Sequence, residues 1–159
     1  MKRYLKTDEW NIIEDEFHAD NLRMSESIFS LGNGRFGQRG NFEEPYSSDC
    51  YIGSFVAGIP FLDKTRVGWW KNGCPHYYTR IPNAANWSSV RLRLIDEELD
   101  LAHWDVHTFN RRLDMHAGIS YRDVTTTSPR GNSLKLHAEH SAHMAHPDLC
   151  LIRYTVTAL

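Results

Sequence analysis

The sequence predicts an all-β fold, an antiparallel β-sandwich with little helix. Short runs rich in β-branched and aromatic residues recur along the 159 residues, and clusters of Gly, Pro, Asn and Asp separate them. Only residues 18–24 favour a short helical turn, and the chain has no internal repeat, linker or low-complexity tract. Regular short strands with turns between them are typical of a sandwich. This length suits a single domain, residues 1–159.

The first half of the chain predicts two strands and a hairpin. Residues 10–17 form a plausible first strand, and residues 50–58 are apolar and β-branched enough for a buried one. Residues 67–70 and 76–79 flank the dipeptide Asn72-Gly73. Because Asn-Gly is the strongest short hairpin signal, these two runs are expected to pair.

The second half predicts two more hairpins and a closing strand. Residues 90–95 alternate between apolar and basic side chains, turn at residues 96–98 and return at 99–101. This alternation predicts a hairpin with one face in water. Further strands are expected at residues 121–127, 133–140 and 149–156, the first two joined by a turn at 129–132.

A glycine-rich stretch contains the pattern G-x-G-x-x-G at Gly32, Gly34 and Gly37. In dinucleotide-binding proteins this motif lies between a strand and a helix whose N-terminus holds the pyrophosphate. Here Gly40 and Pro45 follow within eight residues, and both disfavour a helix. The glycines therefore indicate a bulged, twisting β-turn.

The same stretch carries a family resemblance. Residues 25–44, SESIFSLGNGRFGQRGNFEE, closely resemble the signature near the start of glycoside hydrolase family 65. Segments that agree with the family follow in order, so the resemblance spans nearly the whole chain: residues 51–53, 56–58, 81–83, 86–87, 111–115, 118 and 153–157. Residues 61–80 depart from the pattern of the phosphorylases and resemble an inserted hairpin.

This resemblance implies a function. The family contains inverting phosphorylases of maltose, trehalose and kojibiose together with related α-glucoside hydrolases. It implies that the chain is a truncated part of a large N-terminal super-sandwich domain. The catalytic acid and phosphate-binding residues of the family lie in a barrel of helices that this chain lacks. We therefore expect no catalytic residue here, an inactive fragment, and no cofactor, with inorganic phosphate as co-substrate if the full-length enzyme is a phosphorylase acting on an α-linked glucose disaccharide.

The last predicted strand suggests self-association. Its side chains are largely apolar, and a sandwich cut before its final strands leaves an unpaired edge. We therefore expect a homodimer, which the resemblance also implies because the family's intact enzymes are commonly dimeric. The residues concerned are Leu149, Leu151, Ile152, Tyr154 and Val156.

Composition excludes several classes of protein. No segment approaches the roughly 20 apolar residues of a membrane span, and Asp8 and Glu9 interrupt any signal-peptide core. The net charge is -2 with scattered Lys and Arg, so neither nucleic acid nor membrane is an expected partner. The three separated cysteines, Cys50, Cys74 and Cys150, indicate reduced thiols in a cytoplasmic protein.

Two histidine clusters could carry chemistry. The first has a period of three residues: His137, His140, His143 and His146. On a strand this period sends neighbours to opposite faces, so the favoured interpretation is hydrogen-bonded histidines on a sheet, with metal binding left open. In the second, His103, Asp105 and His107 would share a face of a strand, as a metal site, an acid–base pair or simply a polar outer surface.

Carboxylates and aromatic rings complete the candidates. Nothing in the sequence marks any of the carboxylates Glu26, Glu43, Glu44, Asp96, Glu97, Glu98 and Asp100 as buried. Sugars stack on aromatic rings, and the rings that lie close in sequence are Trp69, Trp70, Tyr77, Tyr78 and Trp87. The alternative to a domain of a family 65 enzyme is therefore a stand-alone carbohydrate-binding or assembly module.

Overall fold

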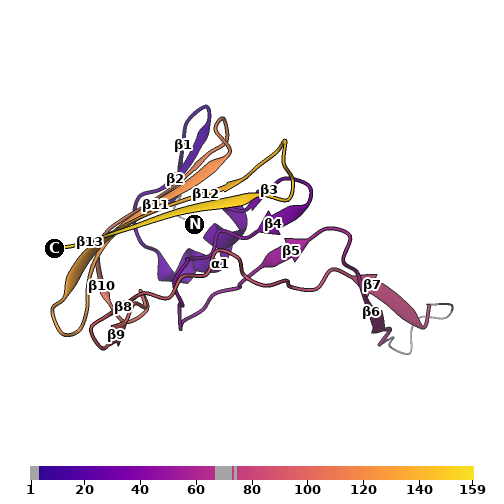
Figure 1. The fold of residues 1–159 in the computed structure, drawn as a ribbon, viewed down its shortest axis with the longest axis horizontal. Helices are drawn as coiled ribbons and strands as arrows, with labels where there is room; N and C mark the ends of the chain where they lie inside the picture. The colour runs from indigo at the N-terminus through magenta and orange to yellow at the C-terminus, as the bar shows by residue number, and fades with distance from the viewer. Residues whose placement is uncertain (1–3, 67–72, 74) are drawn as a thin grey trace.

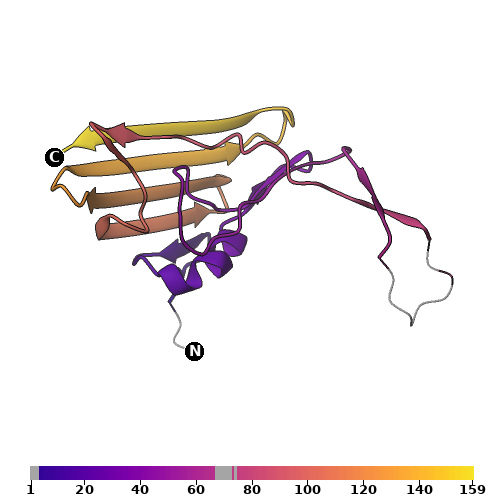
Figure 2. The same cartoon turned by 90° about the horizontal axis from the view of Figure 1, so that it is seen from below.

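The computed structural model describes residues 4–66, 73 and 75–159. A six-stranded antiparallel sheet forms one layer, and a helix with short strands and loops covers one of its faces (Figures 1 and 2). The strands follow the order β1-β2-β10-β11-β12-β13 across the sheet. Their bounds are β1 Lys6–Thr7, β2 Asn11–Glu14, β10 Asp105–Asp114, β11 Ile119–Thr127, β12 Ser133–Ala142 and β13 Cys150–Ala158.

The strands β10, β11 and β12 alternate between buried and more exposed residues because one face of the sheet is covered, whereas the edge strand β13 has no buried residue. On β12, Leu134, Leu136 and Ala138 are buried while Lys135 between them is exposed. Tight turns connect these strands, and Gly118 (φ +67°) is one of the glycines that supply the left-handed backbone such turns require. The resulting meander of sequential antiparallel pairs is a topology with short connections.

The covering layer begins with a 3₁₀ turn, η1 (Ala19–Asn21), which continues into α1 (Leu22–Ile28). Small sheets follow, of β3 (Leu31–Gly32), β4 (Phe36–Gln38) and β5 (Ser54–Val56), and of β8 (Arg93–Leu94) with β9 (Glu97–Glu98). Among the described residues, no helix has the length and apolar character needed to cross a membrane.

A two-stranded arm projects from the rest of the fold. It consists of β6 (Phe61–Lys64) and β7 (Tyr77–Arg80), which pair only with each other within the described residues (Figures 1 and 2). The C-terminus lies at the opposite end of the molecule, beside the far end of the sheet (Figure 1).

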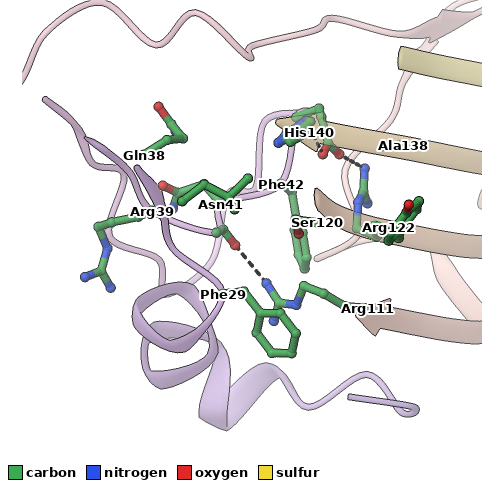
Figure 3. Close-up of a pocket in the computed structure, with 14 residues that line it drawn as sticks. Phe29, Gln38, Arg39, Asn41, Phe42, Arg111, Ser120, Arg122, Ala138 and His140 are labelled. Atoms are coloured by element: carbon green, nitrogen blue, oxygen red, sulfur yellow. Dashed lines mark hydrogen bonds and ion pairs between the residues drawn. The ribbon is translucent and has the colours of Figure 1, made fainter. Parts of the chain in front are cut away.

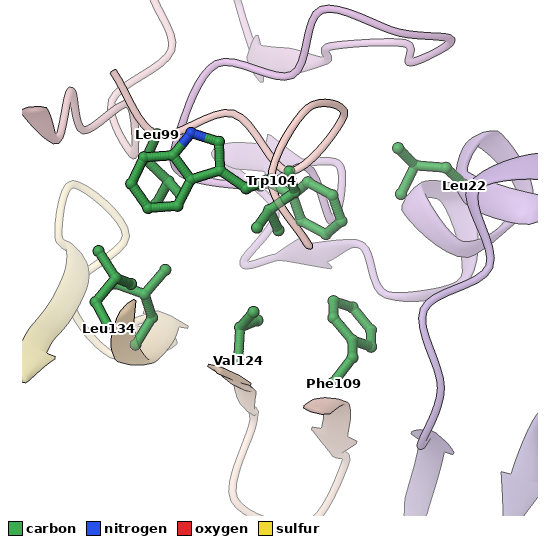
Figure 4. Packing of buried hydrophobic residues seen from close by; sticks show 9 residues of the cluster. Leu22, Leu99, Trp104, Phe109, Val124 and Leu134 are labelled. Carbon is green, nitrogen blue, oxygen red and sulfur yellow. The ribbon is translucent and has the colours of Figure 1, made fainter. Parts of the chain in front are cut away.

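The hydrophobic core lies between the two layers. Phe109, Val124 and Leu134 point from the sheet toward Leu22 and Trp104 of the covering layer (Figure 4). Leu99, Val124 and Leu136 are completely shielded from solvent. Burying one such side chain contributes about 1.5–3 kcal/mol, so this cluster is the main apolar contribution to the fold.

The all-β prediction is confirmed, and the last three strands lie within a few residues of their expected bounds. Two strands are shorter than expected: within residues 10–17 only β2 forms, and within residues 50–58 only β5 forms. The structure also adds β10, which the sequence did not signal, and the helix is one turn longer than expected.

Two predicted hairpins differ in detail. The β8–β9 turn falls at Ile95 and Asp96 instead of residues 96–98, and Ile95 has a φ of +57°, rare for a β-branched residue. In the arm, β7 pairs with residues 61–64. The expected strand at residues 67–70 lies outside the described residues.

Candidate functional site

The glycine-rich motif forms a hairpin. Residues 33–35 make the turn between β3 and β4, and the side-chain oxygen of Asn33 accepts hydrogen bonds from the backbone N–H groups of Arg35 (3.0 Å) and Phe36 (2.8 Å). Gly34 has a φ of +85°, a left-handed backbone conformation that favours glycine. Gly32 and Gly37 do not have a positive φ. Gly37 lies inside β4, and residues 39–53 after it form a loop where a dinucleotide site needs a helix, so the turn interpretation holds.

Asn33 also fastens the hairpin to the loop between β12 and β13. Its side-chain nitrogen donates to the carbonyls of His143 and Pro147, both at 3.0 Å. Arg35 forms an ion pair with Asp148 at 2.8 Å. The loop between β12 and β13 is thereby tied to the motif across more than 100 residues of sequence.

Gly40 is required by a close approach of two segments. A Cβ atom at this position would lie 2.7 Å from the Cβ of Phe29 and 2.8 Å from its carbonyl oxygen. Because Gly40 has no side chain, its backbone comes close enough for its N–H to donate to the carbonyl of Glu26 (2.8 Å). The loop that follows the motif therefore packs directly on the end of α1.

Beneath the motif lies a cluster of buried charges, which we call the buried ion cluster (Figure 3). In its first half, Arg111 of β10 donates through Nε to Glu14 of β2 at 3.0 Å and through Nη1 to the carbonyl of Gly40 at 2.8 Å. Ser25 of α1 donates to Glu14 at 2.9 Å. The strands β2 and β10, the helix α1 and the loop after the motif thus meet at the Glu14 carboxylate and the Arg111 guanidinium.

The second half centres on Arg122 of β11. Its Nη2 donates to both oxygens of Glu44, at 2.6 and 2.8 Å, and pairs with Glu43. His140 of β12 lies 2.9 Å from Glu43, and the hydroxyl of Tyr154 on β13 donates to Glu44. The two adjacent carboxylates therefore bridge three neighbouring strands.

The electrostatics of this half are those of stable ion pairs. Burial raises the pKa of Glu43, but the positive charge of Arg122 and then the hydrogen bond to His140 outweigh it and hold the pKa at about 2. Burial opposes the charge of Arg122, yet Glu43 and Glu44 raise its pKa above the ordinary range. Burial and the Glu44 charge also raise the pKa of the Tyr154 phenol. Glu43 and Arg122 thus keep their charges and Tyr154 keeps its proton, unlike acid–base catalysts poised near neutrality.

A fourth buried carboxylate holds the loop that follows the motif. Glu26 of α1 accepts hydrogen bonds from the Asn41 side chain at 2.7 Å and from the backbone N–H of Tyr51 at 2.8 Å. Asn41 in turn accepts from the N–H of Gly53 at 3.1 Å. Each interaction stabilises the path of residues 39–54 over the sheet.

The spaces around this cluster are small. The cavity shown in Figure 3, lined by Gln38, Arg122 and His140 among others, measures about 20 Å³, room for a single water molecule. A neighbouring hollow of about 170 Å³ is bordered by Glu26 and Glu44, whose oxygens already accept hydrogen bonds. The buried ion cluster therefore acts as a fastener between the two layers.

The burial of three carboxylates corrects the sequence interpretation. Glu26, Glu43 and Glu44 are at most 4 % exposed, although nothing in the sequence marked them as buried. The missed signal lies on the sheet, where Arg111 and Arg122 take inward positions that alternate with apolar residues such as Phe109 and Val124. Inward arginines require buried anionic partners.

The carboxylates at residues 96–100 lie near the β8–β9 hairpin. Glu97 accepts hydrogen bonds from the Ser128 hydroxyl (2.6 Å) and the Asn132 side chain (3.1 Å), which lower its pKa, the Ser128 bond most. Asp100 accepts from the backbone N–H of Ala102 at 2.9 Å. Asp96 and Glu98 are exposed. Glu97 and Asp100 thus stabilise turns.

In the first histidine cluster, His137 and His140 point to opposite faces of β12, as the strand interpretation predicted, whereas the rings of His143 and His146 lie 4.9 Å apart. His137 points outward from β12, where its two ring nitrogens lie 2.9 Å from Asp123 and 3.0 Å from Glu139, and His140 points inward. His143 and His146 belong to the loop before β13. Within the described residues, no three His, Cys, Asp or Glu side chains form a metal-binding group.

The second cluster does not share a strand face, so that expectation is wrong. His103 precedes β10 and lies 3.0 Å from the Ser47 hydroxyl. A β-bulge between Val106 and Thr108 leaves His107 as an extra residue, 2.7 Å from the Thr127 hydroxyl. The bulge breaks the two-residue alternation that the prediction assumed.

The aromatic candidates divide into two locations. Tyr77 and Tyr78 are exposed on the projecting arm. Trp87 is half-buried, with its ring 5.8 Å from that of His140 beside the buried ion cluster. Trp69 and Trp70 lie outside the described residues. Trp87 therefore does not lie on the arm that carries Tyr77 and Tyr78, and the described aromatic candidates belong to two separate places in the fold.

Together, the fold and the buried ion cluster define an all-β domain whose internal charges hold its own layers in place. Residues 12–159 match the glycosyl hydrolase family 65 N-terminal domain. The chain belongs to this family.

Its relatives include disaccharide phosphorylases. The chain is 38 % identical to maltose phosphorylase of Bacillus subtilis (strain 168) over 99 % of its own length and 21 % of that protein. It is 33 % identical to kojibiose phosphorylase of Thermoanaerobacter brockii over 78 % of the chain and 14 % of that protein. A solved structure, a putative kojibiose phosphorylase from human microbiome, matches with a TM-score of 0.90 and 30 % identity over 99 % of this chain and 21 % of that one. The chain thus spans about a fifth of the length of its relatives.

Proposed function

We propose that this chain is the non-catalytic N-terminal β-sandwich domain of a longer family 65 enzyme that cleaves an α-linked glucose disaccharide. The observation that carries the proposal is the match to maltose phosphorylase, which covers 99 % of this chain but only 21 % of the relative. The remaining four fifths of such an enzyme would contain the helical barrel with the catalytic acid. Inorganic phosphate would serve as the attacking co-substrate in a phosphorylase, and no other cofactor is needed.

The internal organisation of the domain supports a scaffolding role. Its buried carboxylates are engaged by Arg111, Arg122 and Asn41, so they maintain the geometry of the domain instead of transferring protons. Free thiols at Cys50 and Cys150 support a cytoplasmic location for the enzyme.

The experiment compares the 159-residue chain with the full-length gene product. Each is incubated with maltose, trehalose and kojibiose, with and without phosphate, and free glucose and glucose 1-phosphate are quantified. We expect no turnover by the chain alone and phosphate-dependent release of glucose 1-phosphate by the full-length phosphorylase. Turnover by the purified chain contradicts the non-catalytic assignment, and glucose release without phosphate identifies a hydrolase.

We further propose that the enzyme is a homodimer and that the chain alone self-associates through β13. This strand lies at the edge of the sheet and exposes Leu151 and Val156. An unpaired edge with apolar side chains favours pairing with a second copy. Light scattering of the chain at several concentrations tests this, with Val156→Pro as the variant that blocks backbone pairing, because the N–H of Val156 points away from β12. A monomeric mass at every concentration contradicts it.

A further inference from the structure

The two faces of the β6–β7 arm differ in chemistry. Directly opposed residues of an antiparallel pair lie on the same face, and the register pairs Phe61 with Arg80 and Asp63 with Tyr78. We call the face formed by these four residues the Tyr78 face. The opposite face, which we call the Tyr77 face, carries Leu62, Lys64, Tyr77 and Thr79.

The side chains of the Tyr78 face form one connected row. Asp63 accepts a hydrogen bond from the Tyr78 hydroxyl at 3.5 Å and pairs with Nη2 of Arg80 at 3.2 Å. The guanidinium of Arg80 lies 5.4 Å from the centre of the Phe61 ring. An aromatic ring, a carboxylate and a guanidinium are therefore held side by side, while 45 % of Tyr78 remains exposed.

The Tyr77 face lacks such a row. Leu62 and Tyr77 are 63 % and 54 % exposed, and among the described residues no hydrogen bond or ion pair joins the side chains of this face. The arm therefore presents two tyrosines of similar exposure, next to each other in sequence, of which only Tyr78 has fixed polar neighbours.

A pyranose ring offers the groups that fit the Tyr78 face. Its C–H face is apolar and stacks on an aromatic ring, and its hydroxyls both donate and accept hydrogen bonds. Asp63 can accept from one hydroxyl while Arg80 donates to a neighbouring one, which matches the combination of apolar surface and few fixed polar groups that ligand sites use. Because Asp63, Tyr78 and Arg80 already hold one another, binding a sugar costs little further side-chain entropy.

We infer that the Tyr78 face binds carbohydrate, with Tyr78 as the stacking platform and Asp63 and Arg80 as the hydrogen-bonding pair. The choice of an α-linked glucoside as ligand rests on the proposed function. The sugar-binding surface itself rests on the arm alone.

The test is a titration of the 159-residue chain with maltose and, separately, with the β-linked disaccharide cellobiose, followed by amide chemical shifts. We expect saturable millimolar binding of maltose, weakened about tenfold in Tyr78→Ala, equivalent to ~1.4 kcal/mol, and similarly in Asp63→Asn. Tyr77→Ala is the matched control, because it removes an equally large ring from the other face. It should change the dissociation constant less than about twofold.

The outcomes separate this inference from the proposed function. No saturable shift with either sugar, or equal losses in Tyr77→Ala and Tyr78→Ala, overturns the Tyr78 face and leaves the phosphorolysis test untouched. Tyr78-dependent binding of cellobiose without maltose supports the Tyr78 face while contradicting the α-glucoside assignment. Unchanged shifts of β10–β13 amides in each variant show that the fold is retained.

Discussion

The carboxylate of Glu14 accepts hydrogen bonds from both Nε and Nη2 of Arg111, joining two strands whose residues lie 97 positions apart in sequence. Both side chains are at most 3 % exposed. The guanidinium also lies 4.7 Å from the centre of the Phe29 ring, so the pair links the sheet to the end of α1. Such a pair is costly to bury but far more costly to break.

Arg111→Met should therefore destabilise the domain strongly. It leaves Glu14 charged and buried without its partner, which costs about 3–5 kcal/mol in the free energy of unfolding. Arg112→Met is the matched control, since the neighbouring arginine points to the outer face and its side chain is 35 % exposed. Its expected cost is below about 1 kcal/mol. Urea unfolding followed by tryptophan fluorescence measures both, and equal losses in the two variants would contradict this account.

Gly40→Ala should also destabilise, for a steric reason. The added Cβ would lie 2.7 Å from the Cβ of Phe29 and 2.8 Å from its carbonyl oxygen, so either α1 or the loop after the motif must shift. Overpacking of this kind costs about 1–3 kcal/mol. Gly37→Ala is the control, because a Cβ there meets nothing within 4 Å and its φ is not positive. Thermal unfolding should separate the two variants by several degrees, and a Gly40→Ala protein as stable as the Gly37→Ala protein would disprove the required approach.

Much of the sheet follows from local sequence pattern. The turns before β11, β12 and β13 contain glycine or proline, and the side chains of β11 and β12 alternate with a period of two, so the bounds of these strands were close to the prediction. The sequence did not predict β10, because the bulge at His107 and the inward-pointing Arg111 both interrupt the alternation of apolar residues. Backbone pairing with β11 along nine residue pairs overrides that weak local signal.

The buried ion cluster depends on partners that sequence spacing does not reveal. Glu43 and Glu44 reach Arg122, which lies almost 80 positions away, and a pair of adjacent carboxylates ordinarily indicates a solvated turn. Only the three-dimensional packing brings β11 beneath the loop after the motif. The arm shows the converse case, since β7 followed from its aromatic residues but its partner strand did not.

Acid should unfold the domain partly through Glu43. Its pKa is held at about 2 in the folded state, against an ordinary value of 4.5, because Arg122 and His140 outweigh the effect of burial. A carboxyl with a depressed folded pKa adds stability above its unfolded pKa, and this contribution is lost as the pH falls from about 4.5 towards 2. Glu43→Gln should be less stable at pH 6, with a smaller loss of stability between pH 5 and pH 3. Urea titrations at each pH, compared between wild type and variant, check this; parallel pH profiles would contradict it.

His137 should behave with the opposite sign. Both ring nitrogens lie about 3 Å from carboxylates, Glu139 and Asp123, so both must carry protons to donate. The hydrogen bond to Glu139 first, and then that to Asp123, raise the pKa above the ordinary 6.5. The charges around the ring are Asp123 on β11, Glu139 on the same strand, and Arg153 of β13, which lies 3.4 Å from Glu139.

A raised folded pKa adds stability that is complete below pH 6.5 and disappears as the pH rises through the folded pKa. An NMR titration of the His137 ring should give a midpoint above 6.5, which moves down in Glu139→Gln and in Asp123→Asn. Lys135→Gln is the control on the same outer face of β12, since no hydrogen bond or ion pair among the described residues joins Lys135 to His137. It should leave the midpoint nearly unchanged. A midpoint that stays the same in all three variants would show that the two carboxylates do not hold the proton on His137.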